Sequence, residues 1–231
     1  MARAVEATTT PVRVPIGEQW LHGDLGIPAE PQGLVLFAHG SGSSRHSPRN
    51  QFVARTLERC GLATLLIDLL TPEEEGIDIR TAEFRFDLEM LADRLVAIVE
   101  WLKRRAGTSS LAIGVFGAST GGGAALMAAA TRPRDITAVV SRGGRPDLAG
   151  RSLAQVTAPT LLIVGGRDEP VIQMNRDAMK QMRGEVSLEI VPGATHLFEE
   201  PGTLEQVAAL AGDWFIRYLK PAVSIRVEKP A

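Results

Sequence analysis

Short apolar runs alternate with amphipathic segments along most of the chain. Three runs, at residues 34–38, 111–116 and 160–164, are almost entirely apolar and are followed within two residues by glycine. Such runs are typical of parallel strands that other elements cover on both faces. Further members of the same sheet are expected at residues 63–67, 137–140 and 187–191, and polar alternation predicts an antiparallel edge pair at 12–16 and 19–25.

Five segments between these runs have the apolar spacing of amphipathic helices, at residues 48–60, 82–105, 120–131, 171–182 and 203–219. Residues 70–80, which include three consecutive glutamates, are expected to form a solvated surface loop. Strands that alternate with helices predict an α/β fold, with a mostly parallel sheet of about eight strands and helices on both faces. We expect one domain over residues 1–231, with a tail from about 222 to 231.

The composition is that of an ordinary globular protein. Hydrophobic residues make up 45% and charged residues 23% of the 231 positions, and the formal net charge is −2. This charge gives no electrostatic reason to expect nucleic acid or an anionic membrane as a partner. The single cysteine, Cys60, cannot form an intrachain disulfide, and no apolar run reaches the length of a signal peptide or a membrane span. A cytoplasmic location is therefore expected.

The run Gly117-Ala118-Ser119-Thr120-Gly121 lies where a predicted strand ends and a predicted helix begins. The G-x-S-x-G spacing has a physical cause, because a serine on so sharp a turn takes a strained backbone conformation and side chains two positions away would collide with it. In an open α/β sheet, ligands bind beyond the carboxyl ends of the strands, which is where Ser119 is expected. Ser119 is therefore a candidate nucleophile.

Two other interpretations of this glycine-rich turn are open. The same residues fit G-x-x-x-G-x-G, a phosphate-binding turn of some nicotinamide dehydrogenases. That turn normally follows the first strand of a domain, and those enzymes use a Tyr-x-x-x-Lys pair, whereas Tyr218 has no lysine four positions later. The second interpretation is a packing turn without chemistry. The choice depends on whether Ser119 has catalytic partners elsewhere in the chain.

A serine nucleophile needs a base, and the base needs an orienting group. On a sheet of this kind both are expected later in the chain, each just past a strand end. Asp168 follows one predicted strand and His196 follows the next. Glu169 is the alternative acid, although it precedes Pro170 and is expected at a helix start. Taken alone, Asp168 could cap that helix and His196 could be a hydrogen-bonded loop residue, but both occur at the predicted strand ends in the predicted order.

The loop after residues 34–38 reads His39-Gly40-Ser41-Gly42-Ser43-Ser44. Its glycines let the backbone approach a substrate, so an amide of this loop is expected to complete an oxyanion hole together with the Thr120 amide. Ser41 is the first candidate and Gly40 the second, and the alternative is a small-residue turn or a helix cap. His39 is expected to orient the loop. No pair of histidines has metal-ligand spacing, so neither a metal nor an organic cofactor is expected.

Residues 141–159, between two predicted strands, leave room for a loop and one short helix, so no large cap domain is expected over the site. Arg142 and Arg145 lie there, at the carboxyl end of a strand. They are candidate substrate-binding residues, because a guanidinium can hold a carboxylate by two hydrogen bonds. The alternative is a salt bridge with a nearby acid such as Asp147 or Asp87.

The order of a His-Gly-x-Gly loop, G-x-S-x-G, Gly-Gly-Arg-Asp and Gly-x-x-His resembles the α/β-hydrolase superfamily, in particular its dienelactone-hydrolase-like branch. The resemblance covers residues from about 12 to 219. It implies Ser119 as nucleophile, His196 as general base and Asp168 as the orienting acid. Dienelactone hydrolases proper carry cysteine in the elbow, and Ser119 departs from that pattern, whereas haloalkane dehalogenases and epoxide hydrolases need aspartate there.

These residues predict a serine hydrolase that cleaves small carboxylic esters or lactones through an acyl-enzyme. Acyl transfer or perhydrolysis with the same triad, and a non-catalytic binding protein of the same fold, are the alternatives. The expected partner is a small ester or lactone substrate, without nucleic acid or membrane, and the sequence leaves the oligomeric state open.

Overall fold

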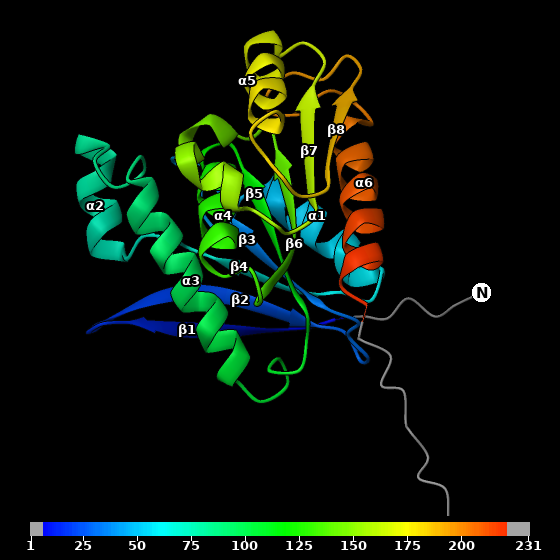
Figure 1. Ribbon diagram of the computed structural model, residues 1–231. Coiled ribbons are helices and arrows are strands. Elements are labelled where there is room, and N and C mark those ends of the chain that lie inside the picture. Colours follow the sequence, from blue (N-terminus) through cyan, green and yellow to red (C-terminus); the bar gives the residue numbers. More distant parts are fainter. Residues whose placement is uncertain (1–6, 221–231) are drawn as a thin grey trace, which may run out of the picture.

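The computed structural model describes residues 7–220, which form one eight-stranded sheet with helices on both faces (Figure 1). The strands are β1 (Thr8–Ile16), β2 (Gln19–Ile27), β3 (Leu34–Ala38), β4 (Ala63–Ile67), β5 (Ile113–Ala118), β6 (Ile136–Arg142), β7 (Thr160–Gly165) and β8 (Val186–Val191). Their order across the sheet is β1-β2-β4-β3-β5-β6-β7-β8. The pairs β1–β2 and β2–β4 are antiparallel, and all other neighbours are parallel. The predicted α/β fold with a mostly parallel sheet is therefore confirmed.

The helices are α1 (Pro48–Arg59), α2 (Pro72–Thr81), α3 (Leu88–Arg104), α4 (Thr120–Thr131), α5 (Glu169–Met179) and α6 (Thr203–Tyr218), with a 3₁₀ segment η1 (Pro146–Gln155). Helices α1 and α6 share one core with the sheet, and α3 and α4 share the other. Alternate residues of β3 face the two cores, since Val35 and Phe37 pack in the core of α1 and α6, and Leu34 and Leu36 pack in the core of α3 and α4. Burial on both faces explains why the central strands read as continuous apolar runs.

Residues 70–80 contain helix α2, so the expectation of a surface loop is wrong. Thr71 is the N-cap of this helix, and its hydroxyl accepts a hydrogen bond from the Glu74 amide while the Glu74 carboxylate accepts one from the Thr71 amide. Pro72 occupies the first helical position. This capping box, together with acidic residues in the first turn, stabilises a helix start. The three glutamates therefore mark a helix N-terminus.

The predicted helix over residues 82–105 begins only at Leu88. Ala82 has a left-handed conformation (φ 58°) that ends α2, and Asp87 caps α3 by accepting a hydrogen bond from the Met90 amide at 3.0 Å. Residues 143–159 contain η1, in line with the expected short helix without a large cap domain. The expected tail at 222–231 lies outside the described residues. Over residues 7–220, no helix combines the length and hydrophobicity that a membrane crossing requires.

Candidate active site

Ser119 lies between β5 and α4 in a strained backbone conformation, with φ 52° and ψ −122°. A non-glycine residue held at such angles costs on the order of 1–3 kcal/mol. The neighbouring backbone fixes it, because the Ser119 amide donates to the Arg142 carbonyl at 3.2 Å and the Ser119 carbonyl accepts from the amides of Gly122 and Arg145 at 3.0 Å. The strained serine is thus held from both sides at the carboxyl end of a central strand.

Gly117 and Gly121 flank this elbow at positions without room for a Cβ. A Cβ on Gly117 would lie 2.6 Å from the Gly121 carbonyl oxygen, and one on Gly121 would overlap the Ala38 carbonyl oxygen and lie 2.6 Å from that of His39. The sequence analysis expected side chains at these two positions to collide with Ser119 itself. The structure shows instead that the glycines let the backbone of α4 and the end of β3 approach the elbow closely.

Gly121→Ala is expected to lower the free energy of unfolding by about 2 kcal/mol, because its Cβ would meet main-chain atoms that cannot move aside cheaply. Gly76→Ala in α2 is the matched control, since a Cβ there meets nothing within 4 Å and alanine favours the helix. Urea unfolding of both variants measures the difference. Equal stability of the two variants would contradict this account of the elbow.

The loops after β7 and β8 bring Asp168 and His196 together. Nδ1 of His196 and Oδ2 of Asp168 are 2.6 Å apart. Asp168 occupies the N-cap position of α5, but its side chain makes no capping hydrogen bond. Its carboxylate therefore serves the imidazole and not the helix end. Glu169, the alternative acid, is the first residue of α5.

The backbone next to the elbow also passes close to the imidazole of His196. Gly143, which has a positive φ of 52°, lies so close that a Cβ on it would be 3.5 Å from Cε1 and Nδ1 of the His196 ring. Within residues 7–220, no hydrogen bond joins the Ser119 hydroxyl to that ring. Catalytic hydrogen bonds of this kind often shorten only when substrate binds. The structure thus pairs the candidate base His196 with the candidate acid Asp168, and places Ser119 at the end of β5, two strands away from β7 in the same sheet.

The loop after β3 packs directly on the elbow. A Cβ on Gly40 would be 3.0 Å from the Ser119 Cβ. The Ser41 amide donates to Thr120 Oγ1 at 3.0 Å, and the Ser41 hydroxyl lies 2.9 Å from the same oxygen. The candidate oxyanion donor Ser41 is therefore in place beside the elbow, with its amide directed at Thr120. The Thr120 amide is in the first position of α4, where amides lack an intrahelical acceptor and the helix dipole is positive.

Both ring nitrogens of the half-buried His39 bond to the backbone. Nδ1 lies 3.0 Å from the Gly40 carbonyl oxygen, and Nε2 accepts a hydrogen bond from the Leu69 amide at 3.0 Å. These two contacts define a neutral tautomer that donates from Nδ1. Burial lowers the pKa of His39 below its ordinary value, so the neutral form persists. His39 thus ties the loop to the segment after β4, which agrees with its expected role.

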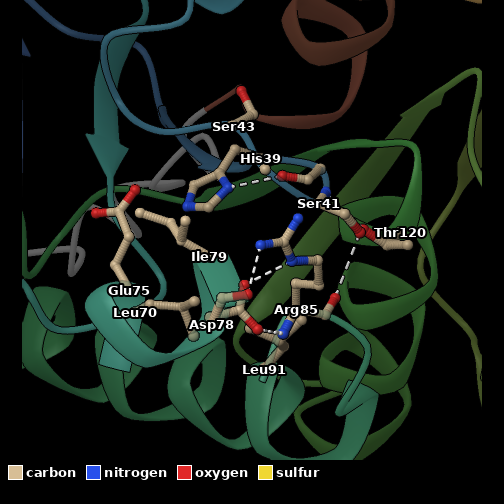
Figure 2. A pocket seen from close by; sticks show the side chains of 12 residues that line it. His39, Ser41, Ser43, Leu70, Glu75, Asp78, Ile79, Arg85, Leu91 and Thr120 are labelled. Atoms are coloured by element: carbon tan, nitrogen blue, oxygen red, sulfur yellow. Dashed lines mark hydrogen bonds and ion pairs between the residues drawn. The ribbon is translucent and has the colours of Figure 1, made fainter. Parts of the chain in front are cut away.

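A cavity of about 380 Å³ adjoins the elbow on the side of α2 and α3 (Figure 2). Thr120 and residues 39–43 form one side of it. The other side comes from α2, α3 and the segments that flank α2, through Leu70, Glu75, Asp78, Ile79, Arg85 and Leu91. Sequence reasoning missed this wall, because residues 70–80 were expected to be solvated. The capping box that begins at Thr71 was the signal that could have revealed it.

Asp78 holds this wall together. Its buried carboxylate accepts hydrogen bonds from the amides of Phe84 and Arg85, at 2.8 and 2.9 Å, and from Nε of Arg85 at 2.6 Å. Burial would raise the pKa of Asp78, but the Arg85 amide and guanidinium and the Phe84 amide hold it below the ordinary value. A charged carboxylate therefore ties the turn at residues 82–87 to α2.

Asp78→Asn is expected to destabilise the protein at neutral pH by about 1 kcal/mol or more, since it removes charge-assisted hydrogen bonds. Because the folded-state pKa is depressed, the stabilisation by Asp78 is complete above an ordinary aspartate pKa of ~3.9 and is lost as the pH falls through the folded value. Urea unfolding at pH 7 and pH 3 should show the difference between wild type and variant shrinking. The exposed Asp213→Asn is the control, and a difference that did not depend on pH would contradict the assignment.

The two candidate arginines of the segment after β6 have different surroundings. Arg145 donates to both oxygens of Asp147, at 2.9 and 2.7 Å, so the salt-bridge alternative is confirmed for it. Arg142 is only 7% exposed, and within residues 7–220 it forms no salt bridge, so that alternative is wrong for it. Burial, with a contribution from the charge of Arg49, lowers the pKa of Arg142 to about 10. Arg142 stays protonated at neutral pH.

The model of the dienelactone hydrolase family matches residues 26–220, which is most of the chain. The chain belongs to the dienelactone hydrolase family. The predicted branch of the α/β-hydrolase superfamily is therefore confirmed. Membership of the dienelactone hydrolase family also supports the coarse prediction that the protein is a hydrolase.

Three relatives of this chain match it over different shares of their own length. The dienelactone hydrolase from Anabaena variabilis, a solved structure, is 59% identical, covers 93% of this chain and 100% of its own, and superposes with a TM-score of 0.92. A Mycobacterium tuberculosis protein named as a candidate phosphoribosyl transferase is 56% identical over 224 residues, which are 94% of this chain and 50% of that protein. The chain thus spans about half the length of this curated relative. A Bradyrhizobium protein named as a 2-oxo-3-(5-oxofuran-2-ylidene)propanoate lactonase is 34% identical over 168 residues, 64% of this chain and 66% of that protein.

Proposed function

We propose that this chain hydrolyses small carboxylic esters or lactones through an acyl-enzyme formed on Ser119. The observation that carries the proposal is the hydrogen bond of 2.6 Å between Asp168 and His196, at strand ends next to a serine with φ 52°. A carboxylate that accepts from Nδ1 leaves Nε2 of the imidazole as the base. The lactonase name of the Bradyrhizobium relative is consistent with this substrate class.

The proposed reaction begins when the Ser119 hydroxyl attacks the substrate carbonyl and passes its proton to Nε2 of His196. Asp168 stabilises the imidazolium through Nδ1. The oxyanion forms beside the N-terminus of α4, where the Thr120 amide can donate to it. The Ser41 amide would add a second donor by turning from Thr120 Oγ1 to the oxyanion, and one such donor commonly lowers the barrier by ~3 kcal/mol.

Collapse of this tetrahedral intermediate breaks the bond to the leaving oxygen, which takes the proton from His196. A water molecule then attacks the acyl-enzyme while His196 accepts its proton. Collapse of the second tetrahedral intermediate breaks the bond to Ser119 Oγ, which takes that proton back from His196, and the acid is released. In a lactone both products remain one molecule, a hydroxy acid. The cavity of about 380 Å³ favours a small acyl group, which would meet apolar side chains such as Leu70 and Leu91 as well as polar ones such as Ser43 and Arg85.

A fluorophosphonate probe tests the nucleophile, and a panel of short esters, lactones and thioesters tests the substrate class. We expect one phosphonylated peptide that contains Ser119, and hydrolysis that this labelling abolishes. Competing alcohols and hydrogen peroxide in the same assay would reveal acyl transfer or perhydrolysis as transfer products. Absence of both labelling and turnover would overturn the proposal in favour of a non-catalytic binding protein.

The phosphoribosyl transferase name belongs to a relative of which the chain matches only half. We assign hydrolysis to the matched half, because the family model, the elbow and the Asp168–His196 pair all lie within it. The proposed partner of this half is its small-molecule substrate.

A further inference from the structure

Arg142 is a buried cation that has no counter-ion among residues 7–220. Its Nε and Nη1 atoms are inaccessible, and within residues 7–220 neither has a hydrogen-bond partner. Its guanidinium carbon lies 5.9 Å from the ring centroid of Phe198, the second residue after His196. Buried polar groups in proteins are almost always hydrogen-bonded, so such donors call for a physical explanation. Arg145, three residues away, has its carboxylate partner, which makes the contrast specific to Arg142.

A second arginine lies near Arg142. The positive charge of Arg49, on α1, lowers the pKa of Arg142, and Nε of Arg49 is also buried without a partner among the described residues. Nη1 of Arg49 is 3.2 Å from Glu199, whose side chain is 63% exposed. Among the described residues, this half-solvated carboxylate pairs with Arg49 and none pairs with Arg142, so the two guanidinium groups carry more positive charge than one carboxylate neutralises. Planar guanidinium forks match the oxygens of carboxylate and phosphate, which makes an anion the natural occupant between them.

Arg142 is placed next to the reacting groups. It ends β6, which lies between β5, the strand before Ser119, and β7, the strand before Asp168 (Figure 1). Its carbonyl accepts a hydrogen bond from the Ser119 amide, and the next residue, Gly143, lies close to the His196 ring. The buried arginine is thus within one residue of contacts to both nucleophile and base.

The guanidinium of Arg142 and the cavity of Figure 2 lie on different sides of the sheet. Ala138 and Val140 of β6 face the core of α1 and α6, and Arg142 continues their alternation toward Phe198 and Arg49. The cavity lies on the opposite side, against α2 and α3. Arg49 and Phe198 also line a separate cavity with Glu199, Glu200 and Glu205, whose carboxylates would repel an anion. An anion is therefore favoured at the guanidinium of Arg142, which is not among the residues that line that cavity.

We propose that Arg142 and Arg49 form an anion subsite for a carboxylate or phosphate on the leaving group of the substrate. The inference rests on the proposed hydrolysis at Ser119, because His196 passes its proton to the leaving oxygen and so defines the leaving-group side. A substrate would then present its small acyl group to the cavity beside α2 and its charged alcohol to the arginines. The subsite selects by charge between esters that share one acyl group.

Three acetate esters of substituted phenols test this subsite. The leaving groups of 4-acetoxybenzoate and 4-acetoxyphenyl phosphate are anionic, and that of methyl 4-acetoxybenzoate is neutral. In Arg142→Met we expect kcat/KM to fall ~10- to 100-fold for the anionic esters, mainly through KM, and to change little for the methyl ester. The loss for one anionic ester and not the other identifies carboxylate or phosphate as the preferred group. Arg217→Met, which removes an exposed arginine from α6, should leave all three values unchanged.

If Arg142→Met lowers kcat/KM equally for all three esters, so that the ratio of kcat/KM between anionic and neutral esters stays as in wild type, the subsite is overturned. If that variant does not fold, inhibition of the wild type by benzoate and inorganic phosphate decides. Competitive inhibition that Arg49→Met weakens supports the proposal, and no inhibition overturns it. Wild type that turns over none of the three esters and takes no fluorophosphonate on Ser119 would refute the proposed function itself. Hydrolysis of the methyl ester without charge selection would refute the subsite alone.

Discussion

Ser119→Ala is expected to lower kcat for ester hydrolysis by a factor on the order of 10⁴ to 10⁶ and to abolish fluorophosphonate labelling. The reason is that alanine removes the nucleophile while the oxyanion donors and the binding cavity stay in place. Alanine keeps the Cβ and therefore the strain at φ 52°, so the free energy of unfolding should change little. Burst kinetics with an activated ester and a urea unfolding curve measure the two quantities.

Ser110→Ala, in an exposed turn before β5, is the matched control, and both its activity and its stability should equal those of wild type. Activity that survived in Ser119→Ala, together with label on another serine, would show that the elbow is a packing turn. The unfolding curve shows whether a loss of activity in Ser119→Ala comes from loss of the nucleophile or from loss of the folded state. Both measurements are therefore made on the same preparation.

Asp168→Asn should lower kcat by a factor of about 10⁴ with little change in KM. An asparagine amide can donate to Nδ1 of His196, which would leave the proton on Nε2 and make that nitrogen unable to accept one from Ser119. The carboxylate also stabilises the imidazolium, and the neutral amide does not. Steady-state kinetics with a short acyl ester measure both parameters.

Glu169→Gln is the control for Asp168→Asn, because Glu169 is the adjacent acid and begins α5. It should retain nearly full activity. The opposite pattern, with a severe loss in Glu169→Gln and a mild one in Asp168→Asn, would reverse the assignment of the acid and contradict the pairing of 2.6 Å between Asp168 and His196.

The candidate site was predictable where topology alone brings residues together. Parallel strands end at one edge of the sheet, so residues that follow three such strands meet there whatever the packing details. Ser119 follows the central strand β5, Asp168 follows β7 and His196 follows the edge strand β8, and the two later residues do form a hydrogen-bonded pair. The elbow was predictable for the same reason, although the structure assigns its glycines to backbone approach.

The environment of single side chains was not predictable. Arg142 and Arg145 are three positions apart in one segment, yet the first is buried against Phe198 and the second pairs with Asp147. The difference arises because Arg142 is the last residue of β6 and follows its alternation, whereas Arg145 lies beyond the strand. The wall of the cavity was missed for another reason, since a row of glutamates has the same composition in a loop and in a helix start.

In the wall formed by α2 and residues 82–87, Asp78 and Arg85 join the two parts, and Glu74 pairs with Arg94 of α3. The wall meets the loop after β3 through a hydrogen bond of 3.4 Å from Ser41 to the Arg85 carbonyl. Ser119 is held instead by the backbone of Arg142 and Arg145, and His196 by Asp168. Substitutions at exposed positions of the wall, such as Glu75 and Ile79, can therefore accumulate without disturbing the reacting groups. Because the cavity wall and the groups around Ser119 are held by different contacts, the lining of the cavity can change during evolution while the arrangement of Ser119, Asp168 and His196 is kept.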